Sequence, residues 1–91
     1  MVENVKGRDG ILFGAQIRAA RALLRWSAAE LAEASAVGAN TIRRAELEDG
    51  ITSMTAANQR VIRQTLEGAG VQFIDEDGGG GPGVRLREPT R

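Results

Sequence analysis

Cysteine, histidine and tyrosine are all missing from this 91-residue chain, and its aromatic residues are one tryptophan and two phenylalanines. Without cysteine, disulfides and thiol nucleophiles are excluded, and without histidine the imidazole base and most structural zinc arrangements are excluded too. The serines therefore have no histidine to activate them. We expect no catalytic residue, no metal site and no cofactor, so the chain is not expected to be an enzyme.

Long apolar runs are also missing, because no stretch approaches the ~18 residues of a membrane span. The first dozen residues lack the apolar centre of a secretory signal, so we expect a cytoplasmic protein with no membrane partner. An apolar content of 42% is typical of a compact helical bundle. A chain of this length forms one small domain with a modest core.

Excess charge of one sign is absent as well, since the formal net charge is zero. Dedicated DNA-binding proteins often have an excess of basic residues, so the zero net charge is mild evidence against DNA binding. The charges are segregated, however, and a neutral total is compatible with a basic face. The basic cluster of the first half is Arg18, Arg21, Arg25, Arg43 and Arg44, and the acidic cluster near the C-terminus is Asp75, Glu76 and Asp77.

Residues 26–46 predict two short helices joined by a tight turn. Ser27 can accept from the backbone N–H of Glu30 while the Glu30 side chain reaches back, which is a capping box, and Trp26 can pack on Leu31 as a hydrophobic staple. This helix should end near residue 35. The segment 36–38 is so short that Val37 is expected to fill the core at the corner of the turn.

A second helix is predicted from about Ala39 to Leu47. A helical wheel with Ile42 pointing into the core places Ala45 and Glu46 on its inward half. Arginine suits guanine O6 and N7, and asparagine suits adenine N6 and N7. The exposed face is therefore a predicted DNA-reading surface, and its side chains are Asn40, Arg43 and Arg44, with Thr41 beside them.

Further helices flank this pair. The spacing of Ile17, Ala20, Arg21 and Leu24 predicts a helix over 14–25, whose Arg18 and Arg25 face either solvent or DNA phosphates. A longer helix is predicted over 54–67, capped by Thr52 or Ser53, with Arg60 and Arg63 in solvent. Its expected inward stripe is Met54, Ala57, Val61, Ile62, Thr65 and Leu66.

Residues 71–75 and 83–87 predict a β-hairpin. Val71 and Phe73 would share a face with Val84 and Leu86, and Arg85 and Arg87 could meet Asp75 or Glu76 across the ladder. This apolar face must cover the bundle or a second subunit. The glycines between the strands formally match a nucleotide fingerprint, but that fingerprint needs a following helix, so we interpret them as a hairpin loop.

The predicted organisation is therefore a mainly α fold. Residues 1–12 form a flexible N-terminal arm, 13–70 a helix-turn-helix domain, 71–88 a β-hairpin that could mediate dimerisation, and 89–91 a tail.

The pattern over roughly residues 17–70 resembles the Cro-like (XRE, phage-repressor) helix-turn-helix family of bacterial transcription regulators. The shared residues are Arg21, Trp26-Ser27, Glu30-Leu31-Ala32, Val37, Thr41-Ile42 and Glu46. The resemblance implies a lambda-repressor-like bundle of about four helices and a buried ion pair between Arg21 and Glu46. It also implies DNA contacts from the two helix starts and the reading helix, at Ser27, Ala28, Gly38, Ala39, Asn40, Thr41, Arg43 and Arg44.

Besides the link 46–53, which differs from the family in spacing and lacks the usual proline, the chain departs from the family at three single positions. The family usually has glycine at Ala36, serine or threonine at Gly38, and a polar residue such as glutamine at Ala28. Each departure removes a cap or a phosphate contact, so weaker DNA binding than is usual for the family is expected. The functional expectation is a sequence-specific double-stranded DNA binder acting as a homodimeric transcription regulator. The alternative is a protein-interaction module, such as an antitoxin-like partner, in which the helix-turn-helix is scaffold.

Overall fold

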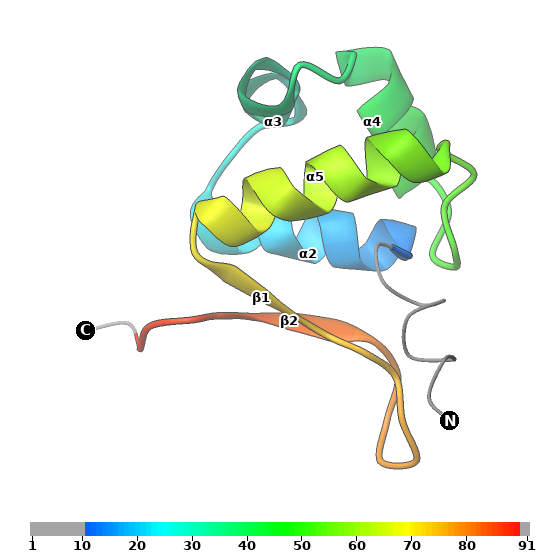
Figure 1. Ribbon diagram of the computed structural model, residues 1–91, viewed down its shortest axis with the longest axis vertical. Coiled ribbons are helices and arrows are strands. Elements are labelled where there is room, and N and C mark those ends of the chain that lie inside the picture. Colours follow the sequence, from blue (N-terminus) through cyan, green and yellow to red (C-terminus); the bar gives the residue numbers. More distant parts are fainter. Residues whose placement is uncertain (1–10, 90–91) are drawn as a thin grey trace.

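The computed structural model describes residues 11–89, which form a helical bundle followed by a two-stranded hairpin (Figure 1). Its helices are α2 (Gly14–Leu24), α3 (Ala28–Ser35), α4 (Ala39–Glu46) and α5 (Ala56–Gly68), and its strands are β1 (Val71–Ile74) and β2 (Gly83–Leu86). The predicted mainly α fold with a C-terminal β-hairpin is confirmed. Residues 1–10 of the predicted arm, and residues 90–91 of the predicted tail, lie outside the described part.

One core serves all of these elements. Its fully buried large side chains come from each of the four helices, from β1 and from the residue pair that precedes α2. They are Leu12, Ile17, Leu31, Ile42, Ile62, Leu66 and Val71.

The predicted flexible arm, residues 1–12, extends too far, because Leu12 belongs to the core. Its side chain is fully buried, its N–H donates to Oε1 of Gln59 at 2.9 Å, and its carbonyl accepts from the N–H of Thr52 at 3.0 Å. These partners lie about forty or more residues along the chain. Because they are so distant, the local pattern of the first dozen residues contains no sign of them.

Helix α5 begins two residues later than predicted, with Thr55 as its cap in place of Thr52 or Ser53. The Thr55 hydroxyl accepts from the N–H of Asn58 at 3.1 Å. Met54 stays in the preceding turn, because its N–H donates to the hydroxyl of Thr52 at 3.1 Å and its carbonyl accepts from Gln59 Nε2 at 2.9 Å. Met54 is nevertheless buried, so its place in the core was predicted correctly and its place in the helix was not.

The inward stripe of α5 is also narrower than predicted. Ile62 and Leu66 are fully buried, but Ala57 and Val61 are exposed. Arg63, expected in solvent, has a side chain only 19% accessible. Its guanidinium carbon lies 5.0 Å from the centroid of the Phe73 ring. This is a cation–π geometry, and it depends on the packing of the hairpin against α5.

The hairpin and the α3–α4 pair lie on opposite sides of α2 and α5 (Figure 1). The strands are antiparallel, with Val71 opposite Leu86 and Phe73 opposite Val84. As predicted, these four side chains share one face, and that face covers the bundle: Val71 and Phe73 are buried and Val84 packs against the core. Consequently, this apolar face is used within the chain and is not available to a second subunit.

Helix α2 is attached to the hairpin through Gln16. This side chain is only 4% exposed, and its Nε2 donates to the carbonyl of Gly83 at 3.1 Å and to that of Ile74 at 3.4 Å. Since Gly83 and Ile74 face each other across the ladder, one buried amide contacts both strands at the loop end of the hairpin.

Arg85 of β2 and Arg87, which follows this strand, do not pair with Asp75 or Glu76, contrary to the prediction. Arg85 lies opposite Gln72 and donates through Nε to Gln72 Oε1 at 2.7 Å. Arg87 donates through Nη1 to the carbonyl of Glu67 at 3.1 Å. The physical reason is the register: the acidic residues follow β1 at the loop end, whereas these arginines lie toward the open end.

Candidate nucleic-acid interface

The turn between α3 and α4 fixes the relative orientation of the two helices. Ala36 has left-handed backbone angles (φ 63°, ψ 18°), and its N–H donates to the carbonyl of Ala32 at 2.8 Å. Val37 follows with only 7% of its surface exposed, and its N–H donates to the Ser35 hydroxyl at 3.1 Å. The turn is therefore closed by a buried side chain, as the sequence predicted.

Helix α4 presents a polar face to solvent. Asn40, Arg43 and Arg44 are exposed and Thr41 is half-buried, whereas Ile42, Ala45 and Glu46 are buried. The wheel therefore assigned the two faces correctly, and Nη1 of Arg43 lies 3.4 Å from Oδ1 of Asn40. This face combines two guanidiniums, an amide and a hydroxyl with no carboxylate among them.

The start of α4 has no side-chain cap. Gly38 occupies the capping position and offers no hydroxyl, and no hydrogen bond within residues 11–89 uses the backbone N–H groups of Ala39, Asn40 or Thr41. Such free N–H groups, together with the positive end of the helix dipole, favour an anion. Because Gly38 stands where the Cro-like pattern usually has serine or threonine, the start of α4 has no side-chain acceptor of its own.

The start of α3 differs, because its own carboxylate closes it. The Ser27 hydroxyl accepts from the N–H of Glu30 at 3.0 Å, and the Glu30 carboxylate accepts from the N–H of Ser27 at 2.7 Å. Ala28 packs against the core. Gly38 and Ala39 thus begin the helix that carries Asn40, Thr41, Arg43 and Arg44, whereas Ser27 and Ala28 lie at the capped start of α3.

The C-terminal end of α4 is joined to α2 by an ion pair between Glu46 and Arg21. Arg21 donates through Nε to Oε2 of Glu46 at 2.7 Å and through Nη2 to Oε1 at 2.6 Å. Its third nitrogen, Nη1, donates to the carbonyl of Trp26 at 2.9 Å. Glu46 is 8% exposed, and the hydrogen bond to this carboxylate raises the pKa of Arg21 against the opposing effect of burial.

Arg18 adds a second attachment, which sequence reasoning missed. It was predicted to face solvent or phosphate, but its Nη1 donates to the carbonyl of Glu46 at 2.5 Å and its Nη2 to Oδ1 of Asp49 at 2.7 Å. A cation at the C-terminus of a helix complements the helix dipole. The orientation of the exposed face of α4 therefore depends on two arginines of α2.

A shallow groove of about 240 Å³ runs between α4 and the start of α5. Its polar groups include the guanidinium of Arg44 and the hydroxyls of Ser53 and Thr55. The α5 side of this groove was missed because the helix start was placed too early, although the Thr55-x-x-Asn58 spacing is a capping signal. The lining residues are Thr41, Arg44, Ala45, Ser53, Met54, Thr55 and Asn58.

No protein-family model, curated protein or solved structure gives a significant match to this chain. Across residues 11–89, no helix has both the length and the hydropathy that a membrane span requires. In the same part of the chain, no group of three histidine, cysteine, aspartate or glutamate side chains is arranged to hold a metal ion.

Proposed function

We propose that this chain is a sequence-specific double-stranded DNA-binding protein of the Cro-like kind, a bacterial transcription regulator that works in the cytoplasm. The observation that carries the proposal is the exposed face of α4, where Asn40, Arg43 and Arg44 point to solvent with Thr41 beside them. An α-helix fits the major groove, and these side chains match the hydrogen-bonding edges of adenine and guanine there.

Two further features support the proposal. The open start of α4 at Gly38 suits a backbone phosphate next to the base-reading residues. The attachment of α4 to α2 through Arg18 and Arg21 fixes the reading face, and such preorganisation lowers the entropy cost of binding. A single reading helix gives little affinity, so the proposed unit is a homodimer that contacts two half-sites about one helical turn (~34 Å) apart.

The test is fluorescence-anisotropy binding to DNA selected from a randomised pool and to the region upstream of the gene, titrated with salt. We compare the wild type with Arg43→Ala/Arg44→Ala, and use Arg25→Ala/Arg60→Ala as a control that removes the same charge elsewhere on the surface. We expect log affinity to fall with log salt at a slope of roughly −0.9 per phosphate contact. Only the α4 variant should lose its preference for the selected DNA.

Equal losses for the two double variants on every DNA sequence would argue against base reading by α4. Absence of binding at low salt would remove the proposal altogether. In the single variants Arg44→Ala and Asn40→Ala, we expect a cost of roughly 1–3 kcal/mol confined to the preferred sequence.

A protein-interaction role is the second candidate, and exposed apolar side chains just after α4 favour it. Leu47 is 83% exposed and Ile51 is 60% exposed, which is unusual for large aliphatic side chains in so small a protein. Leu47→Ser/Ile51→Ser should leave DNA binding intact if the first proposal holds. If the two changes instead abolish copurification with a protein partner while DNA preference is undetectable in the wild type, the scaffold interpretation is favoured.

A further inference from the structure

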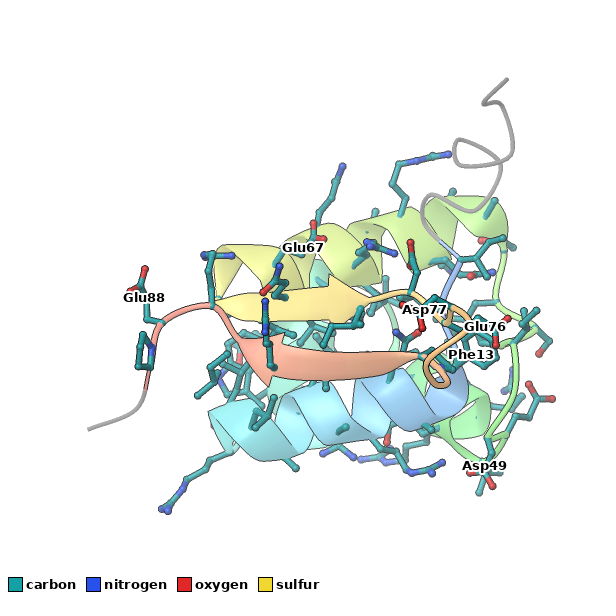
Figure 2. All side chains as sticks on the ribbon, turned by 90° about the horizontal axis from the view of Figure 1, so that it is seen from below. Phe13, Asp49, Glu67, Glu76, Asp77 and Glu88 are labelled. Carbon is teal, nitrogen blue, oxygen red and sulfur yellow. The ribbon has the colours of Figure 1, made fainter. Side chains whose placement is uncertain are left out.

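Three segments that are far apart in the sequence meet at one end of the molecule. Phe13 forms an isolated antiparallel β-bridge with Ile51, in the link that follows α4. Phe13 also lines a small hollow together with Asp75 and Pro82 from the hairpin loop. Figure 2 shows Phe13 beside the hairpin loop and at the same end of the molecule as Asp49. The residues before α2 therefore lie between the α4–α5 link and the hairpin loop.

Large apolar side chains are exposed at this end. Leu47 and Ile51 are the two most exposed large hydrophobic side chains among residues 11–89, and Phe13 beside Ile51 is only half-buried. Exposed apolar groups with a polar rim mark interaction surfaces, whereas solitary ones are ordinary. These three side chains come from segments in contact, so they are a candidate docking surface.

Four exposed carboxylates surround these apolar side chains. Glu48 and Asp49 belong to the link after α4, and Asp75 and Asp77 belong to the hairpin loop. Asp49 pairs with Arg18 at 2.7 Å, and no other ion pair among residues 11–89 involves any of the four. The described part of this end is therefore both apolar and acidic.

The acidic rim decides which kind of partner fits. Nucleic acid and acidic proteins are disfavoured, because like charges that meet at an interface repel each other. A purely apolar partner would remove the carboxylates from water without pairing them, which is costly. A segment that carries both basic and large apolar side chains meets both conditions. Its apolar groups would cover Leu47 and Ile51, and its cations would lie against the carboxylates.

We infer that this end of the molecule docks a basic, apolar-anchored segment of a partner protein. We call it the acidic end surface and define it by Phe13, Leu47, Ile51 and the four carboxylates. A few apolar anchors supply most of the affinity of such an interface, and the surrounding charges set partner choice and association rate. The inference deepens the protein-interaction candidate above and rests on it. It is compatible with DNA reading by α4, because carboxylates repel phosphates from this end.

The experiment selects peptides from a phage-displayed random dodecapeptide library on the full chain, without DNA. Selected peptides are then titrated by fluorescence anisotropy. The apolar variant is Leu47→Ser/Ile51→Ser, with Leu23→Ser/Val61→Ser as its matched control. The charge variant is Asp75→Asn/Asp77→Asn, with Glu33→Gln/Glu88→Gln as its matched control. All of these side chains are exposed, so urea unfolding followed through Trp26 should show every variant to be folded.

We expect the selected peptides to be net positive and to contain large apolar residues. Both surface variants should bind them about tenfold or more weakly than the wild type does, and neither control should. Added salt should weaken binding to the wild type more than binding to the charge variant, because salt screens the pairing of charges.

Any of four results would overturn the inference. The first is a selection that yields no peptides, or peptides without basic charge, and the second is wild-type affinity in the apolar variant. The third is binding that becomes about tenfold stronger in Lys6→Ala/Arg8→Ala, which would assign the surface to the chain's own N-terminal segment. The fourth is self-association in sedimentation velocity that the apolar variant abolishes, which would assign it to a second copy.

These outcomes are separable from the proposed functions. DNA preference without peptide binding would refute only this inference, and peptide binding without DNA preference would refute only DNA reading. A protein partner that copurifies through another surface would leave the protein-interaction candidate standing and refute the acidic end surface.

Discussion

Removing the carboxylate of Glu46 should destabilise the protein strongly. Glu46 is 8% exposed and accepts two hydrogen bonds from Arg21, at 2.7 and 2.6 Å. Loss of one partner from a buried pair costs roughly 3–5 kcal/mol, because the other charge stays buried without compensation. The Arg21 side chain is 22% accessible and keeps its bond to the Trp26 carbonyl, so we expect about 3 kcal/mol for Glu46→Ala, the lower end of that range.

This loss is large for so small a domain, since total stabilities are roughly 0.05–0.15 kcal/mol per residue. The assay is urea unfolding followed by fluorescence. Trp26 is the chain's single tryptophan, and it packs against the core beside the pair. The control Glu33→Ala removes an exposed carboxylate and should change the free energy of unfolding by less than about 0.5 kcal/mol.

The double variant Arg21→Met/Glu46→Leu separates loss of the pair from loss of packing. Replacing both partners by apolar groups of similar volume is often neutral or stabilising, so the double variant should recover most of the stability that Glu46→Ala loses.

The ion pair should also stabilise the protein independently of pH near neutrality. The pKa of Arg21 is raised, so its charge is lost only when the pH rises above the ordinary pKa of an arginine. The contribution should therefore be constant across the neutral range. A loss below about 1 kcal/mol for Glu46→Ala would refute the buried-pair reasoning.

Three further substitutions test the scaffold. Ala36→Gly should raise the urea midpoint of unfolding. Left-handed geometry costs a residue with a side chain about 1–2 kcal/mol. Glycine removes this cost, and roughly half of the gain is offset because glycine also gives the unfolded chain more conformational entropy. Gly14→Ala should lower the melting temperature strongly, since an added Cβ would lie 1.8 and 2.4 Å from two backbone carbonyl oxygens. Gln59→Leu should cost about 1–3 kcal/mol in urea unfolding, because the amide bonds both Leu12 and Met54; an unchanged midpoint would contradict that role.

Local patterns in the sequence predicted each of the described helices and strands, although the start of α5 was placed two residues too early. The capping box at Ser27 joins groups three residues apart, whereas Val37, predicted from the shortness of the turn, is buried by packing in the common core. Strand alternation likewise predicted that Val71 and Phe73 share the inward face of the hairpin. The periodicity of α4 separated its polar face from its buried face, and this separation is the basis of the proposed DNA-reading surface.

Patterns failed where a polar side chain had a choice of distant partners. Arg18 and Arg63 both read as solvent-facing on their own helices, yet one binds the end of α4 and the other stacks over Phe73. A helical wheel treats solvent as the only alternative to the core. It contains no information about a second element that packs along the border between them.

The sequence by itself determined which segments become helices or strands and which face of α4 and of the hairpin is apolar, because those properties depend on local hydrogen bonds and on the period of the side chains. Only the tertiary structure decided that Leu12 belongs to the core, that Arg18 joins Arg21 in holding α4, and that the hairpin covers α2 and α5. Each of these depends on groups far apart in the chain meeting at hydrogen-bond distance, and that meeting is fixed by how the whole bundle packs.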